Sequence, residues 1–154
     1  MNSTQERTLV LIKPDAVSAG YADAIRKIYT DDGLKIGSHR FFVQASRELI
    51  EAHYAAHKGR PYFEDTVSFM TSGPIWALVV SGPNAIDRVR ELNGATDPLE
   101  AKAGSVRQLY GTQKSRNAVH ASDSPESAQQ EITLWFPSPM SHEEQQSLLQ
   151  SEHG

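Results

Sequence analysis

Four short apolar runs are separated by segments with helical spacing, and this alternation restricts the fold more than any other feature of the sequence. The runs cover residues 9–12, 34–43, 75–80 and 118–119, and their β-branched and aromatic side chains favour strands. Helical segments are expected to begin near Ala22, Ser46, Pro61, Pro83 and Ser124. The predicted order is therefore β-α-β-α-α-β-α-loop-β-α.

Leaving out the additional helices reduces this order to βαββαβ, which predicts an α+β, ferredoxin-like fold. Its four-stranded antiparallel sheet would be covered by helices. Lys13 follows the first apolar run and precedes Pro14, which favours extended geometry, so Lys13 is expected where a central strand ends. Residues 93–116 lack any sustained apolar period and are predicted to form a long loop insertion, which is usually functional or disordered.

The length and composition favour one globular domain. The chain has 154 residues, of which about 6–137 are expected to form the core and 138–154 a polar tail. A net charge of -4 argues against a nucleic-acid partner and against membrane binding. The absence of cysteine excludes disulfides, zinc–thiolate sites and thiol catalysis. No apolar run approaches the roughly 20 residues of a membrane helix, so a cytoplasmic location is expected.

The most informative polar segment places His120 where a predicted strand gives way to a loop before a capped helix. A rigid element aims side chains at such positions, and a neutral imidazole is a nucleophile near pH 7. Glu131, on the flank of the buried stripe of the next helix, could hold the other ring nitrogen. The alternative reading is an exposed or satisfied core histidine. The remaining histidines, His39, His53, His57, His142 and His153, have no comparable setting and are read as ordinary.

Common nucleotide-binding signatures are missing, including the phosphate-binding loop and G-x-G-x-x-G. However, several segments occur in an order that resembles the nucleoside diphosphate kinases, from about residue 6 to residue 137. The most specific of these segments, at residues 117–124, matches the pattern N-x-x-H-[GA]-S-D-S. The segments are Ile12-Lys13-Pro14-Asp15, His53-Tyr54, Arg60-Pro61-Tyr62-Phe63, Ser72-Gly73-Pro74, Gly94-Ala95-Thr96-Asp97-Pro98, Arg107 and Asn117-Ala118-Val119-His120-Ala121-Ser122-Asp123-Ser124.

This resemblance implies a nucleoside diphosphate kinase. Such enzymes move the γ-phosphate of a nucleoside triphosphate, usually ATP with Mg²⁺, to a nucleoside diphosphate by a ping-pong mechanism through a phosphohistidine. His120 matches the phosphorylated histidine and Glu131 the glutamate that orients it, with Ser122 beside that glutamate. Tyr54 matches the tyrosine next to the histidine, and Lys13 matches a lysine that contacts the transferring phosphate and the ribose 3′-hydroxyl.

The resemblance also implies nucleotide-binding residues. Asn117 matches a second contact to the 3′-hydroxyl, and Tyr62 matches the aromatic side chain on which the base stacks. The phosphate contacts are matched by Arg90, Thr96 and Arg107. No metal site made of protein side chains is expected, because Mg²⁺ keeps several waters and binds phosphates.

Three positions depart from the family pattern. Ala121 stands where glycine is usual, at a cost on the order of 1 kcal/mol if the position needs a positive φ. Tyr62 replaces the more common phenylalanine and keeps the stacking face. Residues 108–111 differ from the familiar Gly-Asp-Phe type, which affects the expected loop contacts but leaves Arg107 in place.

Two other functions are compatible with this fold. A binding or regulatory module, for example for nucleic acid, is disfavoured by the acidic charge and the missing RNA-binding signature. A phosphocarrier that passes phosphate to protein partners would share the phosphohistidine and differ in its acceptor. The resemblance further implies a homo-oligomer, a tetramer or hexamer built from dimers, and the sequence does not choose between them.

Overall fold

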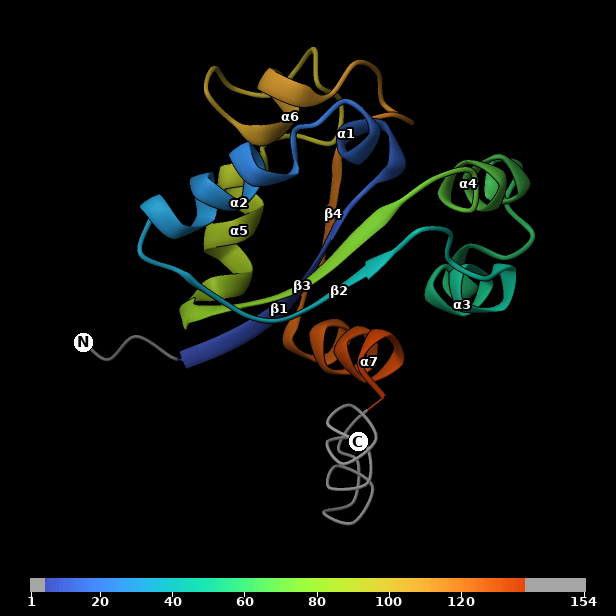
Figure 1. The fold of residues 1–154 in the computed structure, drawn as a ribbon, viewed down its shortest axis with the longest axis horizontal. Helices are drawn as coiled ribbons and strands as arrows, with labels where there is room; N and C mark the ends of the chain where they lie inside the picture. The colour runs from blue at the N-terminus through green and yellow to red at the C-terminus, as the bar shows by residue number, and fades with distance from the viewer. Residues whose placement is uncertain (1–4, 138–154) are drawn as a thin grey trace, which may run out of the picture.

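The four strands form one antiparallel sheet in the order β2-β3-β1-β4, as Figure 1 shows. The structure is a computed structural model that describes residues 5–137. The strands are β1 (Gln5–Ile12), β2 (Lys35–Phe42), β3 (Ile75–Pro83) and β4 (Val119–Ala121). This order and the connecting helices confirm the predicted ferredoxin-like βαββαβ fold.

Strand β1 runs through the centre of the sheet, and its side chains are buried on both faces. Val10 and Ile12 belong to one hydrophobic cluster and Leu9 and Leu11 to the other. Successive side chains of a strand point to opposite faces, so a strand that is buried on both faces has a continuous apolar sequence. The run at residues 9–12 therefore reflects two cores rather than one.

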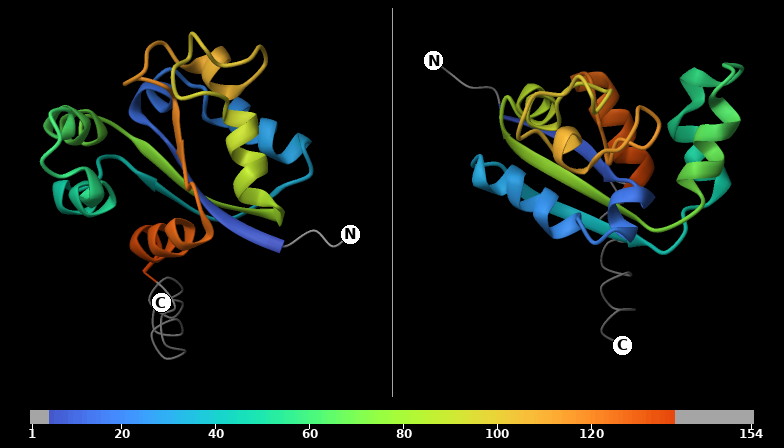
Figure 2. Two further views of the ribbon diagram at one scale, coloured as in Figure 1. Left: turned by 180° about the vertical axis from the view of Figure 1, so that it is seen from behind. Right: turned by 90° about the horizontal axis from the view of Figure 1, so that it is seen from above.

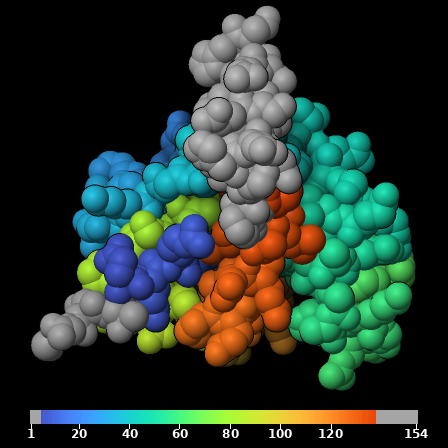
Figure 3. Space-filling view, turned by 90° about the horizontal axis from the view of Figure 1, so that it is seen from below, coloured from blue at the N-terminus to red at the C-terminus, as the bar shows by residue number. Residues whose placement is uncertain are grey.

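Helices cover each face of the sheet (Figures 1 and 2). The first cluster is covered by α1 (Pro14–Ser18), α2 (Ala22–Asp31), α5 (Ala85–Asn93) and α6 (Val106–Tyr110). The second is covered by α3 (Arg47–His53), α4 (Phe63–Met70) and α7 (Pro125–Trp135), and the short 3-10 turn η1 (Ala55–His57) follows α3. Figure 3 shows α7, in orange, between the start of β1 and the segment that contains α3.

Two predicted helix starts are confirmed by their capping hydrogen bonds. The Ser46 hydroxyl accepts from the backbone N–H of Leu49, and the Ser124 hydroxyl accepts from that of Ser127. A side-chain oxygen at this position satisfies one of the N–H groups that the first turn leaves free. Ser124 thus fixes where α7 begins, and α7 carries Glu131 toward the sheet.

Three expectations about helices were wrong. The segment expected to be loop contains α6, five residues long and capped by Ser105, which is too short to display an apolar period. Helix α4 begins at Phe63, after Pro61 rather than with it. Pro83 ends strand β3, and α5 begins only at Ala85, after a residue with left-handed backbone geometry.

Residues 5–137 contain no helix long and apolar enough to cross a membrane. The expected tail at residues 138–154, with His142 and His153, lies outside the described residues.

Candidate active site

A continuous set of hydrogen bonds holds the His120 ring from the centre of the sheet. Nε2 of His120, on β4, lies 3.0 Å from Oε1 of Glu131, on α7. The Ser122 hydroxyl donates to the same carboxylate oxygen at 2.8 Å and accepts from the backbone N–H of Leu9 at 3.1 Å. Ser122 is fully buried, and the His120 and Glu131 side chains are 22% and 18% exposed. The imidazole is therefore fixed at one nitrogen and still accessible.

The backbone just before His120 adopts a strained turn. Ala118 has φ 76°, and the Val119 N–H donates to the Asn117 carbonyl at 2.9 Å, which closes a three-residue γ-turn. The Asp15 carboxylate accepts from the Ala118 N–H at 3.0 Å, and the Lys13 N–H donates to the Ala118 carbonyl at 2.8 Å. The positive φ thus falls on Ala118. The conditional cost at Ala121 does not arise, because Ala121 lies within β4 and its φ is not positive.

The end of β1 brings Lys13 against the same turn. Its Nζ donates to Oδ1 of Asn117 at 2.9 Å, and Nδ2 of Asn117 donates to the Thr96 carbonyl at 3.0 Å. Asn117 is almost fully buried. Burial lowers the pKa of Lys13 to about 8; the positive charges of Arg107 and Arg116 act in the same direction, and Asp15 opposes them.

Arg107, on α6, joins two backbone segments beneath the site. Nη1 donates to the Gly94 carbonyl and Nη2 to the Val119 carbonyl, each at 2.9 Å. Burial lowers the pKa of Arg107, and the nearby charge of Arg90 adds to this. Arg90 itself is exposed on α5. Burial and mutual repulsion both make these positive charges unfavourable. A bound anion would reduce both effects, so the site favours an anionic ligand.

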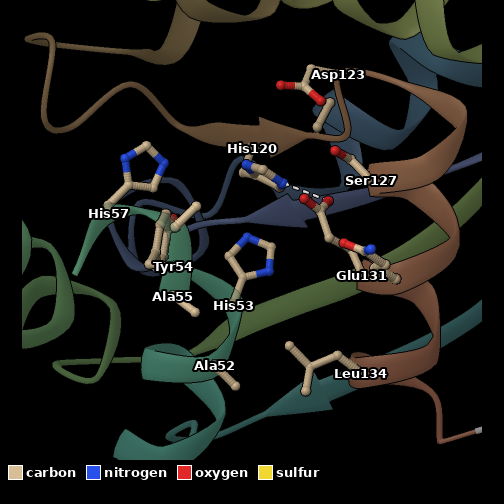
Figure 4. Close-up of a pocket in the computed structure, with 13 residues that line it drawn as sticks. Ala52, His53, Tyr54, Ala55, His57, His120, Asp123, Ser127, Glu131 and Leu134 are labelled. Carbon is tan, nitrogen blue, oxygen red and sulfur yellow. Dashed lines mark hydrogen bonds and ion pairs between the residues drawn. The ribbon is translucent and has the colours of Figure 1, made fainter.

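Two adjoining cavities contain the predicted residues, and Tyr54 lines both. The first, of about 470 Å³, is lined by His120, Glu131, His53 and His57 among others (Figure 4). The second, of about 610 Å³, contains the nucleotide-binding candidates other than Arg90 and Arg107, together with further α4 and loop residues. Its lining includes Lys13, Tyr54, Tyr62, Asp65, Thr66, Phe69, Thr96, Lys114, Arg116 and Asn117.

Tyr54 and Tyr62 differ in burial. Burial raises the pKa of Tyr54, and the carboxylate of Glu131 adds to the effect, so the hydroxyl remains protonated. Tyr62 is half exposed, and its hydroxyl lies 2.6 Å from Nδ1 of His57. The structure thus leaves the Tyr62 ring available to a ligand in the second cavity and anchors it through its hydroxyl.

His53, which was expected to be an ordinary histidine, lies against His120. Its ring centroid lies 4.5 Å from that of His120, and its Nδ1 accepts from Nε1 of Trp135 at 2.9 Å. Burial, followed by the proximity of His120, Lys13 and His57, lowers the pKa of His53 well below its usual value. Two signals were present in the sequence: His53-Tyr54 is one of the segments that resemble the family, and His53 lies three residues after the apolar Ile50, on the same helix face.

Within residues 5–137, the one group of three potential metal ligands comprises His53, His120 and Glu131. Magnesium prefers oxygen ligands in octahedral geometry. Two imidazoles and one carboxylate do not fit that preference. These three residues therefore do not have the ligands of a magnesium site.

Comparisons with known proteins point to a single family. The family model described as nucleoside diphosphate kinase matches residues 6–140. A nucleoside diphosphate kinase of Pelotomaculum thermopropionicum is 47% identical over 131 residues, 85% of this chain and 87% of that protein. The Aquifex aeolicus nucleoside diphosphate kinase superposes with a TM-score of 0.84 at 43% identity, covering 86% of this chain and 96% of that one. A halophilic nucleoside diphosphate kinase from Halobacterium salinarum, solved in complex with CDP, has a TM-score of 0.83 and 39% identity, with coverage of 88% and 90%.

Proposed function

Because the chain belongs to the nucleoside diphosphate kinase family and is a phosphotransferase of that family, we propose that His120 is the residue that carries the phosphoryl group. The donor is a nucleoside triphosphate, usually ATP, and the acceptor a nucleoside diphosphate. The observation that carries the proposal is the Glu131 contact at Nε2 of His120. A carboxylate only accepts hydrogen bonds, so Nε2 carries the proton and Nδ1 carries the free lone pair.

The Nδ1 lone pair attacks the γ-phosphorus and forms a P–N bond, while the bond from that phosphorus to the bridging oxygen breaks. The nucleoside diphosphate leaves with the electron pair. In the second half-reaction, a terminal phosphate oxygen of a different diphosphate attacks the phosphohistidine and returns the lone pair to Nδ1. The Nε2 proton stays toward Glu131 throughout, and Ser122 keeps that carboxylate in place. No external base is needed.

Phosphoryl transfer leaves the protein mainly positioning and charge neutralisation to perform. Lys13 and Asn117, which are hydrogen-bonded to each other, would receive the ribose 3′-hydroxyl, and Lys13 would add charge for the transferring phosphate. Arg107 and Thr96 would contact the other phosphates, with Arg90 reaching in from α5. Tyr54 closes the side of the site next to His120.

The base would stack on the half-exposed ring of Tyr62 in the second cavity. Every base offers a π-face, so stacking tolerates many nucleotides. Family members need a divalent metal, and we propose Mg²⁺ bound to the nucleotide phosphates. When bound, this ion neutralises phosphate charge and orients the triphosphate. The positive charges of Lys13 and Arg107 would add to this neutralisation of the phosphates.

Incubation with γ-labelled ATP tests the proposal. The protein should acquire an acid-labile, alkali-stable phosphate, and added nucleoside diphosphate should remove it. His120→Ala should abolish the label, whereas the matched control His39→Ala, at an exposed position on β2, should retain it. Label that persists in His120→Ala would refute the assignment.

We also propose a homo-oligomer built from dimers, either a tetramer or a hexamer, working in the cytoplasm. Strand β2 lies at the edge of the sheet. Large apolar side chains are exposed there: Phe41, within β2, is 47% exposed, and Val43, just after it, is 77% exposed. Unpaired edges with exposed apolar groups favour association. Light scattering after size-exclusion chromatography would measure the assembly, and a monomer at micromolar concentration would contradict this part of the proposal.

A further inference from the structure

Trp135 determines which nitrogen of His53 carries a proton. Nε1 of Trp135 lies 2.9 Å from Nδ1 of His53. An indole N–H can only donate, so Nδ1 must be the acceptor. A neutral imidazole that accepts at Nδ1 carries its hydrogen on Nε2. Trp135 is fully buried, and its N–H would have no partner if His53 turned away.

The other edge of the His53 ring faces the catalytic histidine. The ring planes of His53 and His120 are nearly perpendicular, at 83°. Figure 4 shows one nitrogen of His53 on the side of His120 and the other turned toward α7. Since the nitrogen near α7 is the one that Trp135 contacts, the nitrogen near His120 is Nε2.

This arrangement has the donor set of a metal site. Ligand atoms of His53, His120 and Glu131 lie within 4.8 Å of one another. Two histidines and one glutamate bind catalytic Zn²⁺ in several enzymes, and imidazole is the most common metal ligand. A transition-metal ion bound here would occupy the nucleophile or its orienting carboxylate and so inhibit the enzyme.

We propose that Trp135 locks His53 in its Nε2–H tautomer, so that His53 presents an N–H to His120 and Glu131 and cannot join them in binding a transition-metal cation. The His53 ring then packs edge-on against the His120 ring. The inference rests on the proposed function only in taking His120 as the nucleophile. The tautomer of His53 does not depend on it.

Metal binding requires a lone pair at the nitrogen that faces the site. To provide one, His53 would have to move its proton to Nδ1, where it would point at the Trp135 N–H. Two donors would then face each other in a partly buried contact, each without an acceptor. Glu131 and His120 alone would leave a cation with two protein ligands, fewer than the three that hold a catalytic zinc ion.

The tautomer can be measured directly in the unmodified protein. A long-range ¹H–¹⁵N correlation spectrum near neutral pH should show His53 Nδ1 as an unprotonated nitrogen and Nε2 as a protonated one. The reverse assignment would overturn the inference. A protein that shows this tautomer but forms no phosphohistidine would refute the proposed function and leave the His53 assignment standing.

The metal consequence is tested with Trp135→Phe, which keeps an aromatic ring and removes the N–H. Co²⁺ binding, followed by visible absorption, should be about tenfold tighter or more than in the wild type, because His53 becomes free to change tautomer. Adding His53→Phe to Trp135→Phe should restore the weaker binding. Trp76→Phe is the matched control and should bind Co²⁺ like the wild type, since Trp76 packs on His39 and Phe41 instead.

Equal Co²⁺ affinity in the wild type and in folded Trp135→Phe would overturn the inference, as would tight binding that survives the His53→Phe change. Circular dichroism establishes that each variant is folded before metal is added. If the loss of the buried indole prevents folding of Trp135→Phe, the tautomer measured in the wild-type protein decides the question by itself.

Discussion

Raising the pH from 7 to 9 should remove the charge from Lys13 in the free protein, because burial lowers the pKa of this side chain to about 8. Nucleotide binding should reverse this, since phosphate anions favour the charged lysine. At pH 9 about nine-tenths of the free protein would hold a neutral Lys13. If the pKa in the complex returns to 10.5, binding takes up about 0.9 proton.

Isothermal titration calorimetry with ADP at pH 9 measures this uptake, using two buffers with different ionisation enthalpies. The second ionisation of a phosphate lies near pH 6, so the ADP phosphates are already fully charged and contribute little. The control is Lys13→Met, which keeps a flexible apolar stem and cannot titrate. Equal heats in both buffers, or the same buffer dependence in Lys13→Met, would refute the reasoning.

The same pKa fixes the sign of a stability change. Between about pH 8 and 10.5 the unfolded chain binds a proton at Lys13 that the folded protein has lost. The contribution of Lys13 to the free energy of unfolding therefore rises with pH across this window. Below about pH 8 the full cost of burying the charged lysine is present. The difference between the two pKa values corresponds to about 3 kcal/mol. Lys13→Met lacks this buried charge, so below about pH 8 its free energy of unfolding should exceed that of the wild type. This difference should shrink by up to about 3 kcal/mol as the pH rises.

Three further predictions concern the neighbours of His120. Ser122→Ala removes the hydroxyl between Leu9 and Glu131 and should lower the free energy of unfolding in urea by about 1–3 kcal/mol; an unchanged midpoint would contradict it. Glu131→Gln should slow single-turnover labelling by ATP roughly tenfold to a hundredfold while ADP affinity, measured by calorimetry, stays the same. Ala118→Val should lower the free energy of unfolding by more than about 1 kcal/mol, because a β-branched residue tolerates φ 76° poorly and the position is fully buried; an unchanged melting temperature would contradict it.

The strands and most helices could be predicted because their signals are local. The apolar run of β1 and the serine caps of α3 and α7 each lie within a few residues of the structure they specify. Helix α6 was missed for the same reason, since five residues give no period and its cap at Ser105 alone is a weak signal. The positive φ at Ala118 follows from hydrogen bonds to residues about a hundred positions earlier, which no local pattern reports.

The site was predicted where a family pattern marks individual residues and was missed where a contact is made only in three dimensions. His120, Glu131 and Ser122 belong to the recognised pattern, and the structure brings them together. His53-Tyr54 is one of the matching segments too, but His53 looked ordinary because its partner Trp135 lies 82 positions later on another helix. Trp135 in turn lies in the buried stripe of α7, and an apolar stripe does not reveal what an indole N–H will contact.

The orientation of His120 depends on the most deeply buried strand rather than on the loops around the cleft. The Leu9 N–H holds the Ser122 hydroxyl, this hydroxyl holds Glu131, and Glu131 holds Nε2 of His120. Leu9 lies on β1, which is paired on both sides and has no exposed side chain at this point. A side chain on a loop would sample many orientations, whereas this one inherits the rigidity of the sheet. The direction of the His120 ring is therefore set by the sheet and by α7.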